Sequence, residues 1–101
     1  MFARVNTFMG GLEHVEDGVA MFRDKVVPEV EKQPGFDGAL FLADRKGQVV
    51  YAMTFWKSEE EMTASEELGK RMAEAAGKQF GSRVETSHCE VALSTLPALV
   101  G

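Results

Sequence analysis

Apolar residues occupy both faces of a strand pair that the sequence predicts near the middle of the chain. Residues 36–43 and 49–56 are apolar runs on either side of a turn at residues 45–47. Side chains alternate between the two faces of a strand, so a sheet with one face in water carries a polar residue at every second position. These runs carry almost none. One face has Leu40, Leu42, Tyr51, Met53 and Phe55, and the other has Ala39, Phe41, Ala43, Ala52 and Thr54. Both faces therefore need a cover.

The segments before this hairpin predict a strand and a helix. Residues 2–9 have the alternating pattern of a strand, which Gly10-Gly11 ends. From Leu12 onward, apolar residues recur at spacings of three and four, as on one face of a helix. Pro28 has no N–H and clashes with the preceding turn, so we expect a kink near residues 24–28. Pro34-Gly35 then ends the helix.

The segments from the hairpin turn onward complete the fold. Gly47 is expected to supply the positive φ of the turn. Ser58 and Glu61 match the capping-box pattern, which predicts a second helix over residues 58–80. Residues 83–95 predict a last strand. The order β-α-β-β-α-β is that of the ferredoxin-like α+β fold, with a four-stranded antiparallel sheet and both helices on one face. We expect residues 1–101 to form a single domain.

Two helices on one face leave the other face of the sheet without a cover. If the five residues on that face, from Leu40 to Phe55, bury about 100 Å² each, the gain is roughly 10 kcal/mol before the costs of association. This gain is comparable with the whole stability of a small domain. We therefore expect a homodimer in which two sheets pack face to face about a two-fold axis, giving a dimeric β-barrel.

Charge and composition exclude several classes of protein. The net charge is −5 and no basic patch stands out, which disfavours nucleic acid as a partner. The apolar stretches are too short to span a bilayer, and the N-terminal residues do not have the layout of a signal peptide. Cys89 is the one cysteine, so no internal disulfide can form. We expect a cytoplasmic protein that does not bind membranes.

Several features resemble the antibiotic-biosynthesis monooxygenase-like domains of the dimeric α/β-barrel superfamily. They are the first strand with Asn6, the Pro34-Gly35-Phe36 turn, the hairpin, and the FWKSEE segment at residues 55–60. The resemblance covers residues 2–93. It implies the ferredoxin-like fold and a homodimer. It also implies a cofactor-independent monooxygenase that acts on a small aromatic or polyketide-type substrate, through an ionised ring that reacts with O₂.

The haem-degrading branch of the same superfamily fits this chain less well. That branch uses an Asn on the first strand, a Trp at the end of the third strand and an axial His on the following helix. Asn6 and Trp56 match the first two. Ser65 and Glu66 stand where the His is expected, and residues 58–80 contain no His. Without an imidazole the haem iron has no protein ligand there, so we expect no cofactor.

The resemblance places Asn6 and Trp56 under the helices, where they are the candidate catalytic residues. Asn6 is expected to polarise a substrate oxygen, and Trp56 to stack on an aromatic ring. Phe41, Thr54, Phe22 and His88 are the candidate substrate-binding residues. The alternative is that Trp56 only fills the core. Two other functions remain open: a non-catalytic small-molecule-binding or stress-related dimeric module, and an isomerase or cyclase acting on polyketide-like rings.

The remaining titratable residues add little chemistry. His88 and Cys89 are neighbours on a strand and point to opposite faces, so they cannot form a nucleophile–base pair. His88 is either a lone general base or an edge-strand surface residue, and Cys89 is expected to be a small core residue. His14 is expected to be solvated at the start of a helix. No residues have the spacing of a zinc or non-haem iron site, so no metal is expected.

Overall fold

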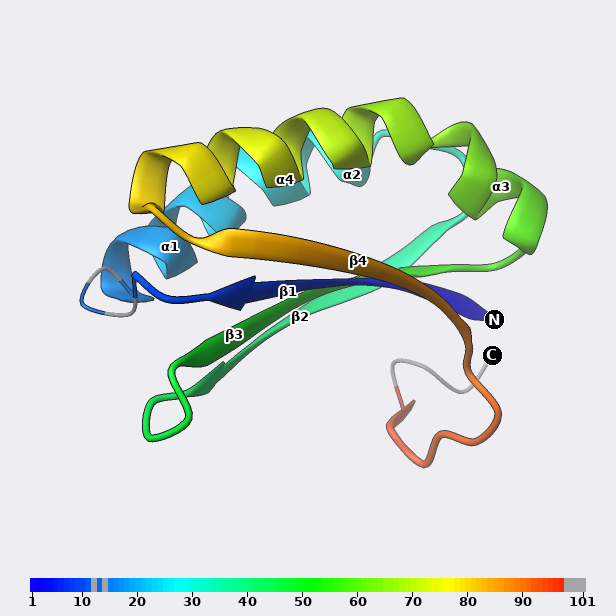
Figure 1. Ribbon diagram of the computed structural model, residues 1–101. Coiled ribbons are helices and arrows are strands. Elements are labelled where there is room, and N and C mark those ends of the chain that lie inside the picture. Colours follow the sequence, from blue (N-terminus) through cyan, green and yellow to red (C-terminus); the bar gives the residue numbers. More distant parts are fainter. Residues whose placement is uncertain (12, 14, 98–101) are drawn as a thin grey trace.

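The computed structural model describes residues 1–11, 13 and 15–97. Its centre is a four-stranded antiparallel sheet in the order β2-β3-β1-β4. The strands are β1 (Phe2–Met9), β2 (Phe36–Asp44), β3 (Val49–Trp56) and β4 (Arg83–Glu90). The helical segments α1 (Val15–Met21), η2 (Phe22–Val26), α2 (Val27–Val30), α3 (Glu59–Ala64) and α4 (Glu66–Phe80) lie on one side of this sheet (Figure 1). The predicted ferredoxin-like α+β fold is confirmed.

The strand register confirms the predicted division into two faces. Asn6 pairs with Ala52 and Ala52 with Phe41, and Arg4 pairs with Thr54 and Thr54 with Ala39, so these side chains share the face under the helices. Leu40 pairs with Met53, and Leu42 with Tyr51, on the opposite face, called here the open face. One side of the sheet therefore holds the helices and the candidate site.

The first helical region has the expected irregularity near Pro28. Residues 22–26 form a π-helical turn, in which the N–H of Val27 donates to the carbonyl of Phe22, and Pro28 is the second residue of α2, the α-helical turn that follows. Proline supplies no N–H to the helical ladder, and such wide turns occur where that ladder is interrupted. The irregular turn places Phe22 and Val26 toward the sheet, where both line a cavity.

The second helical region is two helices, so the prediction of one helix over residues 58–80 was wrong. Ser58 caps α3 as expected, accepting the N–H of Glu61 at 3.1 Å. The break is at Ser65. In an unbroken helix the Met62 carbonyl would accept the N–H of Glu66. Here that oxygen accepts from Arg4 Nη2 at 2.6 Å and from Ser65 Oγ at 2.7 Å. A charged side chain from the first strand thus occupies the acceptor that would have continued the helix.

Three local predictions need correction. The positive φ of the hairpin turn belongs to Gln48, at 59°; a Cβ at Gly47 would lie 2.4 Å from Asp44 Oδ2, so the exposed Asp44 carboxylate would have to move. The last strand ends at Glu90 rather than at residue 95, because Glu90 pairs with Phe2, the first residue of its partner strand β1; beyond it the N–H of Val91 donates to the carbonyl of Met1. Cys89 is exposed rather than buried, because its side chain points to the open face of an edge strand.

The open face is apolar but not fully exposed. Leu40 and Leu42 are 36% and 46% exposed, whereas Phe55 is only 6% exposed. No described helix lies on this face, and Figure 1 shows the segment after β4, at residues 91–97, turning to that side of the sheet. The estimate of roughly 10 kcal/mol for five exposed side chains was therefore too large.

No described helix is long and apolar enough to cross a membrane.

Candidate functional site

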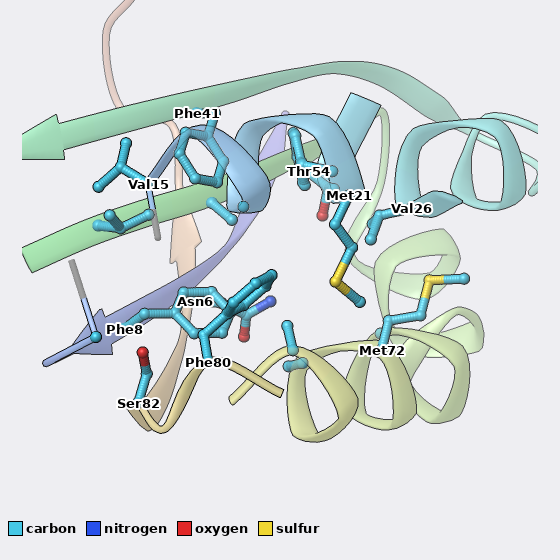
Figure 2. A pocket seen from close by; sticks show the side chains of 18 of the residues that line it. Asn6, Phe8, Val15, Met21, Val26, Phe41, Thr54, Met72, Phe80 and Ser82 are labelled. Atoms are coloured by element: carbon cyan, nitrogen blue, oxygen red, sulfur yellow. The ribbon is translucent and has the colours of Figure 1, made fainter. Parts of the chain in front are cut away.

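A cavity lies between the helix-covered face of the sheet and the helices (Figure 2). Its volume is about 80 Å³, and it is partly open to the surface. Most of its lining is apolar, and includes Val15, Met21, Val26, Met72 and Phe80. Drug-sized ligands occupy pockets of roughly 300–1,000 Å³, so this cavity suits a single ring or the end of a larger molecule. The flexible Met21 and Met72 allow its shape to adjust.

Four of the six residues singled out from the sequence line this cavity. They are Asn6, Thr54, Phe41 and Phe22. The rings of Phe22 and Phe41 lie 5.5 Å apart at an angle of 47°, and so make one aromatic corner of the wall. Trp56 and His88 are not among the described lining residues. His14 and residues 98–101 lie outside the described residues.

Asn6 turns its amide into the cavity from the middle of β1 (Figure 2). Its Oδ1 accepts a hydrogen bond from Thr86 Oγ1 at 2.7 Å, on the neighbouring strand β4. This bond fixes the orientation of the amide group, because an amide has one acceptor side and one donor side. Among the hydrogen bonds of the described residues none involves Nδ2, so its two N–H groups remain for a ligand.

Trp56 lies behind the cavity wall rather than in it. It is fully buried, and its ring meets Phe36 edge-on, with centroids 5.7 Å apart, in a cluster with Val30 and Met62. Its Nε1–H donates to Thr54 Oγ1 at 3.0 Å. Thr54 does line the cavity. The contact of Trp56 with the cavity thus runs through the Thr54 hydroxyl.

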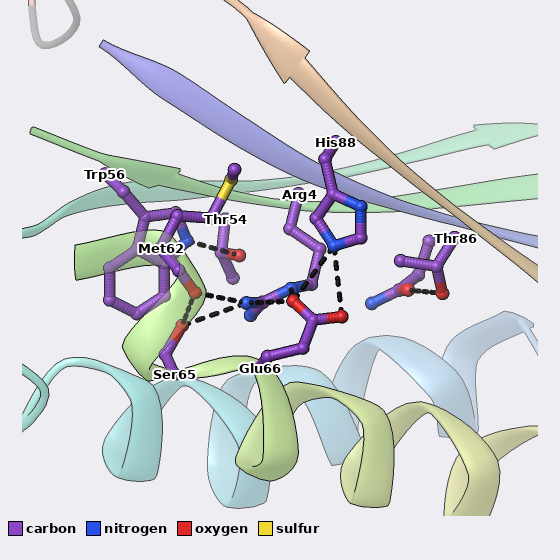
Figure 3. A network of polar contacts seen from close by, with 9 residues as sticks. Arg4, Thr54, Trp56, Met62, Ser65, Glu66, Thr86 and His88 are labelled. Carbon is purple, nitrogen blue, oxygen red and sulfur yellow. Dashed lines mark hydrogen bonds and ion pairs between the residues drawn. The ribbon is translucent and has the colours of Figure 1, made fainter. Parts of the chain in front are cut away.

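Arg4 is the functional candidate that the sequence analysis missed. Its side chain is 2% exposed and lines the cavity two residues before Asn6. Nη2 donates to the Met62 carbonyl and to Ser65 Oγ, and Nη2 and Nε both donate to Glu66 Oε2 (Figure 3). The guanidinium carbon lies 5.8 Å from the centroid of the Trp56 ring, which adds a cation–π attraction. A buried cation is thus held by four groups: the Met62 carbonyl, the Ser65 hydroxyl, the Glu66 carboxylate and the Trp56 ring.

Glu66 joins this buried cation to His88 on the edge strand. Its carboxylate accepts from Arg4 at 2.8 Å and lies 2.9 Å from His88 Nε2 (Figure 3). Burial alone would raise the pKa of Glu66, but the hydrogen bond with His88 and the charge of Arg4 outweigh burial and hold that pKa below its usual value. Glu66 is therefore an anion at neutral pH, and His88 is a partner of this anion outside the cavity.

A signal for Arg4 was present in the sequence. Arg4 shares a strand face with Phe2, Asn6 and Phe8, and that face was predicted to lie beneath helices. A charge at such a position must find a counter-charge, since charges are almost never buried unpaired. Its partners stand more than 60 residues further on, and no local pattern identifies them.

The residues present do not fit a haem. Ser65 and Glu66, which stand where an axial His was looked for, are both engaged by Arg4. The described residues of α3 and α4 contain no His, and hydroxyl or carboxylate groups tied to a guanidinium are not free to bind iron. The described residues also contain no group of three or more His, Cys, Asp or Glu placed to hold a metal ion.

Comparison with known sequences gives distant relatives. No family model matches the chain. Two uncharacterized proteins of Mycobacterium tuberculosis strains are each 28% identical over 92 residues, which are 91% of this chain. Those residues are 41% of each relative, so the chain spans about two-fifths of the length of the curated relatives it matches.

Solved structures are similar to this chain over most of its length and over most of their own length. A monooxygenase from ActVA-Orf6 of Streptomyces coelicolor, in complex with nanaomycin D, has a TM-score of 0.73 at 20% identity, over 95% of this chain and 91% of that chain. The heme-degrader MhuD of Mycobacterium tuberculosis, with two hemes bound, has a TM-score of 0.69 at 21% identity, over 93% and 98%. SnoaB, a cofactor-independent oxygenase of Streptomyces nogalater, has a TM-score of 0.63 at 20% identity, over 95% and 96%.

A dimeric ferredoxin-like protein from an uncultured marine organism is also similar, with a TM-score of 0.66 at 10% identity, over 95% of this chain and 99% of that chain. These identities are low, and such likeness speaks for the fold rather than for an activity. The resemblance found in the sequence is confirmed at that level: the chain has the ferredoxin-like fold of the antibiotic-biosynthesis monooxygenase-like proteins.

Proposed function

We propose that this protein is a cofactor-independent monooxygenase-like enzyme that oxidises a small aromatic or polyketide-type substrate in the cavity beneath its helices. The observation that carries the proposal is the Asn6 amide, held by Thr86 with its N–H groups turned into an otherwise largely apolar cavity. Donors placed in this way stabilise negative charge on an oxygen atom of a bound ring. The Phe22–Phe41 corner supplies an aromatic wall.

The reaction needs a substrate that supplies its own electrons. An anthrone-like ring loses a proton to solvent water and gives an anion delocalised between its oxygen and a ring carbon. That carbon transfers electrons to O₂ and forms a C–O bond, and the resulting peroxide takes a proton back from solvent to give a hydroperoxide. Cleavage of the O–O bond with loss of the remaining C–H proton then releases water and leaves a carbonyl, so a CH₂ group and O₂ become C=O and H₂O. Asn6 stabilises the ionised oxygen, the cavity wall keeps the ring oriented, and Trp56 acts as a positioning residue through the Thr54 hydroxyl.

Oxygen uptake with dithranol tests this activity. The rate with protein is compared with the protein-free rate, for wild type, Asn6→Ala, and the exposed-surface control Lys70→Ala. Loss of one charge-stabilising donor typically lowers such rates by about 10²–10³. We expect uptake by wild type and by Lys70→Ala, and a rate near the protein-free value for Asn6→Ala. No uptake above the protein-free rate by wild type would reject the proposal for this substrate class.

A second candidate is a non-catalytic small-molecule-binding module. It is favoured by the lining of the cavity, because among the described lining residues Arg4 is the one with a titratable side chain, and a guanidinium does not act as a base near neutral pH. Saturable binding of dithranol under argon, without oxygen uptake in air, would support this candidate.

We also propose that the functional unit is a homodimer joined through the open face. Leu40 and Leu42 on this face are exposed, and a second copy would remove them from water. Met53 pairs with Leu40 on this face, so Met53→Glu places a charge within it and should give a monomer by light scattering at micromolar concentration. Lys78→Glu, on an exposed position of α4, should leave the dimer intact. A monomeric wild type would contradict this proposal.

A further inference from the structure

A groove lies beside the cavity, between the first helical region and the edge strand β2. Its volume is about 400 Å³, and it is more open to the surface than the cavity is. Two residues, Phe22 and Phe41, line both spaces. The rest of the described groove lining consists of Val19, Arg23, Val27, Phe36 and Ala39. The ring pair that forms the aromatic corner of the cavity is therefore also the partition between the cavity and the groove.

The wide turn of η2 places Phe22 beside both spaces. In a π-helical turn the carbonyl of one residue accepts from the N–H of the fifth residue after it, as the Phe22 carbonyl accepts from Val27 here. Val27 lines the groove, whereas its neighbour Val26 lines the cavity. Such turns are frequent at functional sites. Here the turn sets the partition between two apolar spaces.

A bulge and a small residue shape the strand side of the groove. The register of β2 against β3 shifts between Phe36 and Gly38, and Phe36 pairs with Trp56. Phe36 therefore joins Ala39 and Phe41 on the helix-covered face. Its ring meets the Trp56 ring edge-on, which fixes this end of the groove. Ala39 lies between the two phenylalanines, and its small side chain leaves the floor of the groove open.

The groove offers apolar contact and little polar chemistry. Arg23 is the one charged residue in its described lining. The Arg23 side chain is exposed, and its Nε and Nη2 donate to the Asp24 carboxylate at 2.8 Å and 3.0 Å. The guanidinium is thus engaged at the surface, while its hydrocarbon stem can add to the apolar wall. A group that fits this groove is a hydrocarbon.

We propose that the groove is a subsite for a flexible alkyl chain carried by a ring that lies in the cavity. The cavity, at about 80 Å³, suits one ring, and the two spaces together fall within the roughly 300–1,000 Å³ of drug-sized ligand sites. The rings of Phe22 and Phe41 are in contact, with centroids 5.5 Å apart, and both side chains are half-buried. One ring must turn aside for a ligand to pass. A saturated chain is narrower than a fused ring system and needs the smaller opening.

The inference deepens the proposed function and rests on it for the position of the ring. It adds an alkyl chain to the substrate and assigns the choice of chain length to Val19 and Ala39, which among the described residues line the groove and not the cavity. The groove runs from Phe41 to Phe36, roughly 15 Å along the strand. Complete burial of a methylene raises affinity about fourfold, so we expect about twofold in a groove that covers part of the chain.

The test measures the dissociation constants of phenol, 4-ethylphenol, 4-butylphenol and 4-hexylphenol under argon, by competition with the fluorescent ligand 2-naphthol. We expect wild type to gain about twofold or more in affinity for each added methylene. Ala39→Phe fills the groove from its floor, so it should remove this gain and leave the affinity for phenol unchanged. Ala43→Phe makes the same substitution at an exposed position on the same face of β2, and should keep the gain.

A second variant keeps the test decisive if Ala39→Phe does not fold. Val19→Phe fills the groove from α1 and should likewise remove the gain. The inference is overturned if wild type binds none of the four phenols, if its affinity does not rise with chain length, if either groove variant retains the gain, or if Ala43→Phe loses it. The assay contains no oxygen, so the expected series without oxygen uptake from dithranol in air would reject the monooxygenase and leave the subsite standing. Oxygen uptake with no gain from the chain would reject the subsite alone.

Discussion

The pairing of Arg4 with Glu66 predicts that removing the more exposed partner costs more stability than removing the buried one. Arg4→Met leaves no buried acceptor without a hydrogen bond, because the Met62 carbonyl still accepts from Ser65 Oγ and the Glu66 carboxylate still lies within hydrogen-bond distance of His88 Nε2. Glu66→Ala instead leaves a guanidinium that is 2% exposed without its counter-charge. Removing one partner of a buried ion pair lowers the free energy of unfolding by about 3–5 kcal/mol.

The exposure of Glu66 reduces this figure. Its side chain is 39% exposed, so water replaces part of what the carboxylate provided. We expect Glu66→Ala to lower the free energy of unfolding by about 2–3 kcal/mol, and Arg4→Met by about 1–2 kcal/mol, since methionine refills the apolar part of the site. Once Arg4 is gone, Glu66 is an ordinary surface residue. The double variant should then be no less stable than Glu66→Ala alone.

Urea unfolding of wild type, Arg4→Met, Glu66→Ala and the double variant, all at one protein concentration, measures the coupling free energy between Arg4 and Glu66. Glu67→Ala, an exposed neighbour on the same helical turn, serves as the control and should stay within about 0.5 kcal/mol of wild type. The reasoning fails if Glu66→Ala is as stable as the control, or if the double variant loses the sum of the two single losses.

The remaining predictions concern the glycines and the acid limb of stability. Gly18→Ala should raise the free energy of unfolding by about 0.5–1 kcal/mol, because its Cβ would lie an ordinary 3.5 Å from Phe41 Cζ and alanine favours a helix. Gly69→Ala should lower it by about 1–3 kcal/mol, because its Cβ would displace the Arg4 guanidinium; thermal unfolding that ranks the two alike would contradict this. The pKa of Glu66 is lowered on folding, so its contribution to stability is present above the ordinary Glu pKa and is lost as the pH falls through the folded value. Glu66→Gln should therefore flatten the fall in urea midpoint below about pH 4.5, and an unchanged acid profile would show that this carboxylate is not linked to folding.

The sequence predicted most of the fold because the relevant signals are local. Period-two alternation divided the strand residues between two faces, and the family resemblance indicated that the face of Asn6, Phe41 and Thr54 lies under the helices; the strand register agrees with both. The Ser58 cap and the irregular turn before Pro28 depend on neighbours within a few residues. Such features are decided by backbone geometry and by short-range hydrogen bonds.

The errors arose where a long-range contact overrode a local preference. Residues 58–80 have a helical pattern throughout, yet the helix breaks at Ser65 because Arg4, about 60 residues earlier, bonds the Met62 carbonyl. Cys89 has the character of a core residue, but β4 is an edge strand and its open face has no helix above it. Neither outcome is encoded in the neighbours of the residue concerned.

The sequence by itself determined the order of the elements, the two apolar faces of the sheet and the presence of Asn6 beneath the helices. The tertiary structure decided which polar atoms are left free. Thr86 turns the Asn6 amide, Trp56 occupies an acceptor lone pair of Thr54, and Glu66 holds one side of Arg4 so that Nη1 remains. The physical reason is that a hydrogen bond saturates a particular atom. The chemistry left for a ligand therefore depends on partners that only the folded chain brings together.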